Sequence, residues 1–263
     1  MRIEPGTRAI VTGASRGIGR ATAAALAARG ARLGLMARSR DPLEELAGEL
    51  GGETVVLAAD VGDRESVGAA VGRFVEQAGG VELLVANAGI AHYAPFTELP
   101  IERAEEMVRI NVLGTLYTVK AALPHMLDRA AGHVVVVASG ASLRAFPWAA
   151  TYGATKSAQS AFAEALRHEL SGTGVSVSTV FPGEIATDLH AHERDRMPDW
   201  YRGSDAIPPQ RVAEAIVRVV EDDRRTAYVP PIVRALGINA LAPRLADRLL
   251  ATLRGATAAP RRD

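Results

Sequence analysis

Short apolar runs rich in β-branched residues alternate along the chain with longer segments whose apolar residues recur at helical spacing. The short runs predict buried strands and the longer segments predict amphipathic helices. The predicted strands are Arg8 to Thr12, Ala31 to Ala37, Thr54 to Ala58, Leu83 to Ala86, His133 to Ala138, Ser176 to Phe181 and Ala227 to Val229. The predicted helices are Ile18 to Arg29, Pro42 to Leu50, Arg64 to Gln77, Ile101 to Leu127, Tyr152 to Leu170 and Pro209 to Glu221. This alternation predicts an α/β fold, in which a parallel sheet of about seven strands is flanked by helices on both faces.

Five glycines stand where these helices stop, and we expect a positive φ at each; they are Gly30, Gly51, Gly79, Gly132 and Gly172. The length of 263 residues suits one domain, which we place at residues 1–254, with a flexible tail at 255–263. An amphipathic stretch, Ile232 to Arg254, carries a leucine stripe formed by Leu236, Leu241, Leu245, Leu249 and Leu253. It indicates a helix docked on the domain or on a partner subunit, and contact with a membrane surface is the alternative.

Composition narrows the possible partners and sites. Thirty basic residues balance thirty acidic ones, so we expect neither nucleic acid nor an anionic membrane as a partner. The absence of cysteine excludes disulfides and thiolate chemistry. We expect no transmembrane segment and a cytoplasmic location, because Met1 to Thr7 is not apolar and no apolar run reaches membrane-spanning length. We also expect no metal site, since His190 and His192 have no third ligand at a clear spacing and are interpreted as surface residues.

A glycine-rich turn follows the first predicted strand, as Thr12-Gly13-Ala14-Ser15-Arg16-Gly17-Ile18-Gly19, and leads directly into an alanine-rich helix. Glycines at positions 13, 17 and 19 allow backbone N–H groups to approach a pyrophosphate, and the helix dipole favours the anion. Any tight strand-to-helix turn also favours glycine, so the turn by itself is weak. Its place after the first strand of a repeating pattern is the context that a dinucleotide site requires.

The end of the second predicted strand favours NADP(H) over NAD(H). An NAD site usually places an acidic residue there to hold the ribose hydroxyls, whereas this chain has Met36-Ala37-Arg38-Ser39-Arg40. Arg38 together with Arg16 is suited to bracket a 2′-phosphate. The alternative is that both are solvated surface arginines in an arginine-rich chain.

Tyr152 and Lys156 lie four residues apart and therefore share one face of a predicted helix. A free tyrosine titrates near pH 10, so it serves as an acid or base at neutral pH only beside a cation that stabilises its phenolate. Lys156 is one of only two lysines in the chain. Ser139 ends the preceding strand at the sheet edge where ligands bind, and it is suited to hydrogen-bond a substrate oxygen; Ser142 is the weaker candidate.

These motifs together resemble the short-chain dehydrogenase/reductase family, over nearly the whole chain to about Val229. The matching positions, besides the glycine turn, are Asp60-Val61, Asn87-Ala88-Gly89, Asn111, Ser139, Tyr152, Lys156, Pro182-Gly183, Ile185 and Thr187. The resemblance implies a Rossmann-type doubly wound sheet and an oxidoreductase. Ala86 departs from the family pattern, which commonly has a second asparagine there, and we expect a small structural effect.

The resemblance also implies individual roles. Asp60 and Val61 would contact the adenine, Asn87 and Ile185 the inner half of the cofactor, and Thr187 the nicotinamide amide. Lys156 would bind the nicotinamide ribose, and Asn111 would hold a water that relays protons to it. The alternatives are purely structural: Asp60 as a turn residue, Pro182-Gly183 as a strand terminator and Thr187 as a helix cap. The family also implies a homodimer or homotetramer, formed through the helices Ile101 to Leu127 and Tyr152 to Leu170.

We therefore predict an NADP-dependent oxidoreductase that transfers a hydride between nicotinamide and a carbonyl or secondary alcohol. Mostly apolar loops predict a hydrophobic substrate; their residues are His92, Tyr93, Phe96, Leu143, Phe146, Trp148 and the segment Leu189 to Tyr201. Residues 188–206 are predicted to form a lid over this substrate. The alternatives are a dinucleotide-sensing regulator without chemistry, and a lyase or epimerase on the same scaffold.

Overall fold

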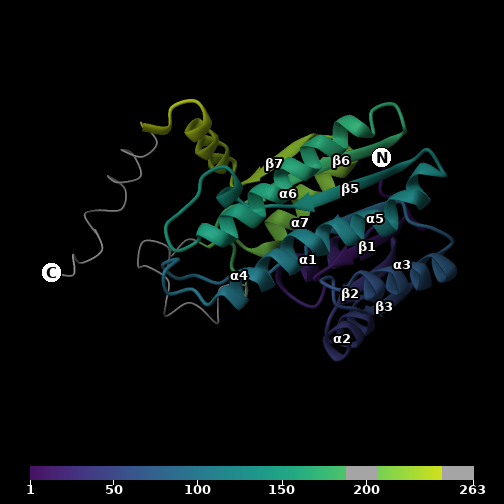
Figure 1. Cartoon of the computed structure of the whole chain (residues 1–263). Coiled ribbons are helices and arrows are strands. Elements are labelled where there is room, and N and C mark those ends of the chain that lie inside the picture. The colour runs from purple at the N-terminus through teal and green to yellow at the C-terminus, as the bar shows by residue number, and fades with distance from the viewer. Residues whose placement is uncertain (188–205, 245–263) are drawn as a thin grey trace.

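The computed structural model describes residues 1–187 and 206–244 of the chain. Seven strands form one sheet in the order β3-β2-β1-β4-β5-β6-β7, and every neighbouring pair is parallel (Figure 1). The strands are β1 (Arg8–Thr12), β2 (Arg32–Ala37), β3 (Thr54–Ala58), β4 (Leu83–Ala86), β5 (Gly132–Val137), β6 (Val175–Pro182) and β7 (Thr226–Val229). The chain order reverses between β1 and β4, which is the doubly wound topology predicted from the sequence.

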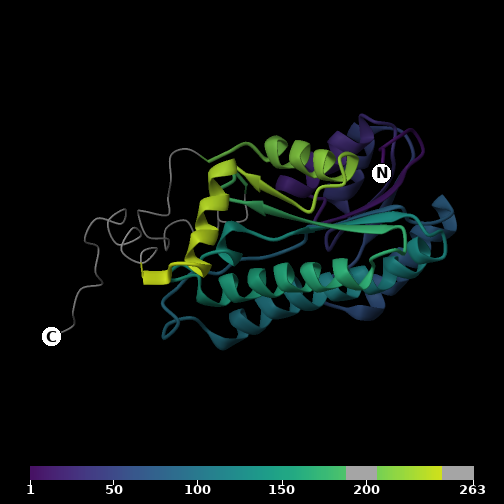
Figure 2. The same cartoon turned by 90° about the horizontal axis from the view of Figure 1, so that it is seen from above.

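Helices cover both faces of the sheet because the strands are apolar on both faces. Helices α1 (Gly17–Ala27), α2 (Asp41–Leu50) and α7 (Pro209–Glu221) pack on one face. The other face is covered by α3 (Arg64–Ala78), α5 (Gly114–Leu127) and α6 (Ala150–Glu169). Figure 2 shows the sheet between these two layers. The Rossmann-type fold is thereby confirmed, and most predicted element bounds agree with the observed ones to within one or two residues.

The prediction of one continuous α-helix over Ile101 to Leu127 is wrong. Residues 101–127 do not form a single α-helix but α4 (Ile101–Met107), a π-helical turn η1 (Val108–Leu113) and then α5. Asn111 lies in this π-turn, with its side chain hydrogen-bonded to Ile90 and Thr155 outside the helix. An asparagine that bonds outside a helix competes with the regular pattern, and π-turns are frequent at functional sites. The departure therefore marks a residue that the sequence had already singled out.

The prediction for Gly132 is also wrong. The other four glycines have a positive φ as expected, but Gly132 does not, and it begins β5 instead. Ala130 takes the positive φ after α5. A side chain at position 132 would instead clash with Met126, because a Cβ there would lie 2.7 Å from its Cγ.

The C-terminal stretch differs from its prediction as far as it is described. Pro231–Ala240 forms a 3-10 helix, η5, rather than the start of a long α-helix. Val233 and Leu236 pack against the loops that follow β5 and β6, whereas Leu241, on the predicted stripe, is 90% exposed. The rest of the stripe, the tail 255–263 and the predicted lid, except Ala206, lie outside the described residues. None of the helices in the described ranges is long and apolar enough to span a membrane.

A buried histidine lies at the amino-terminal edge of the sheet, opposite the end where ligands bind. Nε2 of His133 lies 2.7 Å from Oγ of Ser178, and its Nδ1 has no hydrogen-bond partner among the described residues. Burial lowers the pKa of His133 to about 4, against a smaller opposing effect of Asp223. The imidazole is therefore neutral in the folded protein at neutral pH.

We expect this histidine to make the fold sensitive to acid. In the folded protein His133 takes up a proton only near pH 4, whereas in the unfolded chain it does so near pH 6.5. The free energy of unfolding is therefore unaffected by this histidine above pH 6.5 and decreases as the pH falls from 6.5 to 4. The loss at the lower end should reach about 3 kcal/mol. Urea unfolding at a series of pH values measures it. The slope of the unfolding free energy against pH should become smaller in His133→Gln but not in the control His168→Gln, where the histidine is exposed. Equal slopes in wild type and both variants would contradict the account.

Candidate active site

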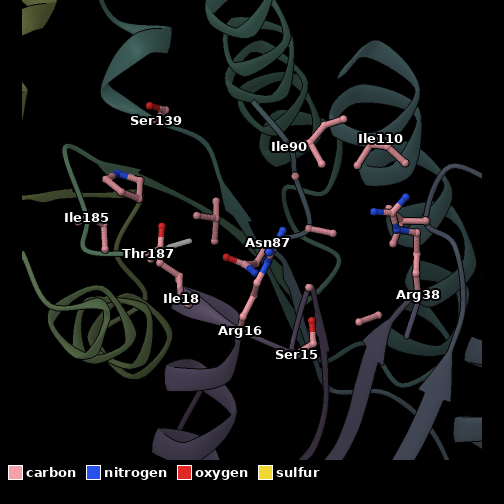
Figure 3. A pocket seen from close by; sticks show the side chains of 18 of the residues that line it. Ser15, Arg16, Ile18, Arg38, Asn87, Ile90, Ile110, Ser139, Ile185 and Thr187 are labelled. Carbon is pink, nitrogen blue, oxygen red and sulfur yellow. The ribbon is translucent and has the colours of Figure 1, made fainter. Parts of the chain in front are cut away.

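A cavity of about 420 Å³ lies at the carboxyl ends of the strands (Figure 3). Most residues that the sequence singled out line it: Gly13, Ser15, Arg16, Gly17, Ile18, Arg38, Asp60, Val61, Asn87, Ala88, Gly89, Ser139, Tyr152, Lys156, Pro182, Gly183, Ile185 and Thr187. Gly19 and Asn111 lie behind the wall. The structure thus brings together residues from the ends of six strands, β1 to β6, around the switch point of the sheet, where open α/β sheets bind ligands.

The glycine turn leaves the amino end of α1 open to the cavity. A Cβ at Gly19 would overlap with the carbonyl group of Gly13, and one at Gly17, where φ is +55°, would lie 3.0 Å from Cγ2 of Thr187. No side chain in the described part of the chain caps this helix, whose N-cap is Arg16. Its first N–H groups are thus available to an anion, as a pyrophosphate site requires.

Thr12 and Asn87 join the carboxyl ends of β1 and β4. Oγ1 of Thr12 accepts hydrogen bonds from the backbone N–H groups of Asn87 and Ala88, both at 2.9 Å. The side-chain amide of Asn87 donates to the Thr12 carbonyl at 2.9 Å. Sequence reasoning missed this role of Thr12, although its place before the first glycine was a signal. Ala86, the departure from the family pattern, is buried within β4.

One end of the cavity carries charge. Asp60 accepts hydrogen bonds from the Gly62 N–H at 2.8 Å and from Nη1 of Arg109 at 3.1 Å, and it forms an ion pair with Arg109. Burial raises the pKa of Asp60, but these two hydrogen bonds and the nearby cations outweigh it, so the pKa lies below its ordinary value. In Figure 3, Arg38 lies toward this end with Ile110, and Ser139 and Ile185 lie toward the other. The two ends of the cavity therefore differ chemically: one carries Asp60 and Arg38, and the other carries Ser139.

Ser139 lies at the second end, and Lys156 and Tyr152 contact residues on either side of it, Val137 and Ala141. Nζ of Lys156 donates to the Val137 carbonyl at 3.1 Å and lies 5.9 Å from the centroid of the Tyr152 ring. Burial lowers the pKa of Lys156 to about 8. The amine therefore remains largely protonated at neutral pH, and it is a cation placed beside a buried phenol.

Ser139 is held by its own loop. Its Oγ accepts a hydrogen bond from the N–H of Ala141 at 3.1 Å, which leaves its hydroxyl proton to be donated elsewhere. Ser142, the weaker candidate, does not line the cavity; its hydroxyl donates to the carbonyl of Ser139. Of these two serines, only Ser139 lines the cavity.

Asn111 is fully buried beneath this end. Its side-chain oxygen accepts from the N–H of Ile90 at 2.8 Å, and its amide donates to the Ile90 carbonyl at 2.9 Å and to Oγ1 of Thr155 at 3.0 Å. A Cβ at Gly89 would lie 3.2 Å from Oδ1 of Asn111 and 3.5 Å from Nζ of Lys156. Asn111 thus fixes the loop after β4 close to Lys156, and the proton relay stays a prediction.

Among the residues that the structure describes, none of the predicted substrate residues lines this cavity. Tyr93 is buried and packs against Tyr152, with the two rings tilted and their centroids 5.9 Å apart, and Phe146 packs on the same cluster. Phe96 and Trp148 are exposed, and Leu189 to Tyr201 lie outside the described residues. Tyr93 therefore supports the tyrosine ring, which corrects its prediction as a substrate contact.

Sequence reasoning missed several apolar or small residues of the wall, namely Ala37, Ser39, Pro42, Ala59, Ile90, Ile110, Val137 and Ala138. Ile90 and Ile110 adjoin the predicted Gly89 and Asn111, which was the available signal. Within residues 1–187 and 206–244, no cluster of three His, Asp or Glu side chains is arranged to hold a metal ion. His190 and His192 fall outside these ranges.

The chain is similar in sequence to known oxidoreductases. The short chain dehydrogenase family model matches residues 7–198. Glycine betaine reductase ATRR of Emericella nidulans is 36% identical over 229 residues; these are 84% of this chain but only 18% of that longer protein. An uncharacterized oxidoreductase of Staphylococcus aureus is 34% identical over 212 residues, which cover 80% of this chain and 88% of the relative.

Solved structures show the same likeness. A short chain dehydrogenase/reductase from Burkholderia phymatum, in complex with NAD, superposes with a TM-score of 0.85 at 26% identity, covering 93% of this chain and 96% of that one. An alcohol dehydrogenase from the archaeon Thermococcus sibiricus, complexed with 5-hydroxy-NADP, superposes with a TM-score of 0.73 at 33% identity, covering 84% and 94%. The chain therefore belongs to the short chain dehydrogenase family of oxidoreductases.

Proposed function

We propose that this chain is an NADP-dependent oxidoreductase that transfers a hydride between nicotinamide and the carbonyl or alcohol carbon of a hydrophobic substrate. The observation that carries the proposal is the convergence of Ser139, Tyr152 and Lys156 at one end of a cavity whose other parts are a glycine turn and Arg38. The residues fit a dinucleotide, because the turn has no room for a side chain at Gly19 and exposes an uncapped helix end. Bound NADPH supplies the hydride.

The residues of this chain handle the substrate oxygen and its proton. Ser139 donates its free hydroxyl proton in a hydrogen bond to that oxygen and orients it. Tyr152 gives a proton to the oxygen during reduction and removes it during oxidation. Lys156, buried and cationic beside the ring, stabilises the phenolate left by that transfer. Asn111 keeps Gly89 and Ile90 fixed around this group and, in the proposal, holds the water that supplies the proton.

The preference for a hydrophobic substrate is supported by the surroundings of Tyr152. Ile90 packs beside its ring, and Ile90, Val137 and Ala138 give the cavity an apolar wall there. We also propose that α5 and α6 form the interface of a homo-oligomer. The cytoplasmic location stays a prediction.

We expect the protein to bind NADPH at least about tenfold more tightly than NADH. Arg38 lines the cavity at the end of β2, where an NAD site would have an acidic residue, and a guanidinium matches a phosphate well. Fluorescence titration of the purified protein with each cofactor measures the ratio. Arg38→Asp should remove the preference, whereas the matched variant Arg40→Asp, beside it but outside the cavity wall, should keep it. A wild type that prefers NADH, or an Arg38→Asp variant with an unchanged ratio, would refute the proposed selectivity.

A further inference from the structure

The π-turn η1 gives three consecutive residues three different contacts with the site. Arg109 forms an ion pair with Asp60, Ile110 lines the cavity, and Asn111 holds Ile90 and Thr155. The wider turn of a π-helix separates successive side chains by a smaller angle than an α-helix does, so adjacent residues reach neighbouring parts of one wall. Asn111 belongs to the predicted catalytic set, but nothing in the proposed reaction so far uses Arg109.

The contact between Arg109 and Asp60 is close and specific. Nη1 of Arg109 lies 3.1 Å from Oδ2 of Asp60, while Oδ1 of the same carboxylate accepts from the N–H of Gly62. A Cβ at Gly62 would overlap with the guanidinium, so the arginine lies directly against that backbone. The side chains of Arg109 and Asp60 are 42% and 34% exposed, and ion pairs this exposed add little to folding stability. A role in stability alone does not explain the arrangement.

Asp60 also interacts with a second cation at this end of the cavity. Arg38 contributes to keeping the pKa of Asp60 low, after the larger effects of burial, Gly62 and Arg109. Asp60 and Arg38 both line the cavity, and no ion pair between them is present in the described structure. Without Arg109, the Asp60 carboxylate would carry an unbalanced charge that attracts Arg38 and repels a phosphate.

We propose that Arg109 is a positioning residue for cofactor selectivity: it binds the Asp60 carboxylate, so that Arg38 stays available for the 2′-phosphate of NADP. The side chains of Asp60, Arg109 and Arg38 then lie near one another at this end of the cavity. Because Arg109 pairs with Asp60, the guanidinium of Arg38 is left to bind a phosphate. The inference rests on the proposed function, because it deepens the account of how the same site selects its cofactor.

The variant Arg109→Met tests it by removing the charge while retaining an unbranched chain. We expect the ratio of NADPH to NADH affinity to fall by about tenfold, mainly through weaker NADPH binding, since Asp60 then competes for Arg38. Replacing Asp60 as well should restore the ratio. In Asp60→Asn, where no carboxylate competes, adding Arg109→Met should change the ratio by less than about twofold.

A matched control is Arg103→Met, since Arg103 is an exposed arginine on α4 that pairs with Glu106 and does not line the cavity. It should leave the ratio unchanged. A merely structural role of Arg109 would weaken both cofactors together, equally in the Asp60→Asn background, and that result would overturn the inference. So would an unchanged ratio in Arg109→Met. If wild type shows no preference for NADPH at all, the proposed cofactor itself is wrong, which is a distinguishable failure.

Discussion

Replacing Tyr152 with phenylalanine should lower kcat by about a thousandfold, while the Kd for NADPH stays within a few fold. The variant loses only the hydroxyl that exchanges a proton with the substrate oxygen. The ring remains, so its packing against Tyr93 and the buried position of the side chain are kept. Steady-state turnover of a hydrophobic ketone gives kcat, and a fluorescence titration with NADPH gives Kd.

The matched control for this variant is Tyr117→Phe, which removes a hydroxyl from a half-buried tyrosine on α5 outside the cavity wall. It should keep the turnover of the wild type. Retained activity in Tyr152→Phe would refute the assignment of Tyr152. A parallel loss of cofactor binding would show that the hydroxyl mainly builds the cofactor site.

Replacing Lys156 with methionine should lower kcat by about a hundredfold or more and at the same time stabilise the fold. The activity falls because the cation beside the phenol is lost. The fold gains because the lysine is buried without a carboxylate partner among the described residues, and this burial lowers its pKa from 10.5 to about 8. That shift corresponds to a destabilisation of about 3 kcal/mol, which the variant removes. The variant also loses the hydrogen bond to Val137, which reduces this gain by roughly 1 kcal/mol. We expect a net gain of about 2 kcal/mol at neutral pH.

The pH dependence of this gain has a definite sign. Because the folded-state pKa of Lys156 lies below the unfolded value, the cost of burying the charge is present in full below about pH 8 and disappears as the pH rises toward 10.5. The stability advantage of Lys156→Met should therefore shrink over that range, as urea unfolding measures. The control Lys120→Met alters the only other lysine, an exposed one, and should keep the turnover and the pH dependence of stability of the wild type. A destabilised Lys156→Met would contradict the cost assigned to the buried charge.

The fold could be predicted from the sequence because short apolar runs and segments of helical spacing alternate regularly along the chain. Strands that are apolar on both faces must be covered by helices on both faces of the sheet. A strand followed by a glycine turn and a helix is typical of the first unit of a dinucleotide-binding sheet. The π-turn at Val108–Leu113 could not be predicted in this way. The helical period continues through it, and only the bonds of Asn111 to Ile90 and Thr155, which are distant in sequence, show why the helix is interrupted.

The candidate site was predictable where a residue type has one strong chemical use. Tyr152, Lys156 and Ser139 could be predicted because a tyrosine needs a cation and a hydroxyl partner to act on a carbonyl, and all three line the cavity. Tyr93 was assigned to the substrate because loop aromatics commonly line pockets, but its ring is instead buried against Tyr152. Arg109 gave no signal in the sequence, since one arginine among many looks alike until a carboxylate is seen beside it.

The most direct test of the central claim is to follow deuterium from NADPH labelled at the nicotinamide C4 into a panel of hydrophobic ketones by mass spectrometry. The account predicts label at the alcohol carbon of the product, one cofactor oxidised for each ketone reduced, and little transfer in Tyr152→Phe. Binding of NADPH without any transfer would contradict it and indicate a sensor, and substrate conversion without net oxidation of the cofactor would contradict it and indicate a lyase or epimerase.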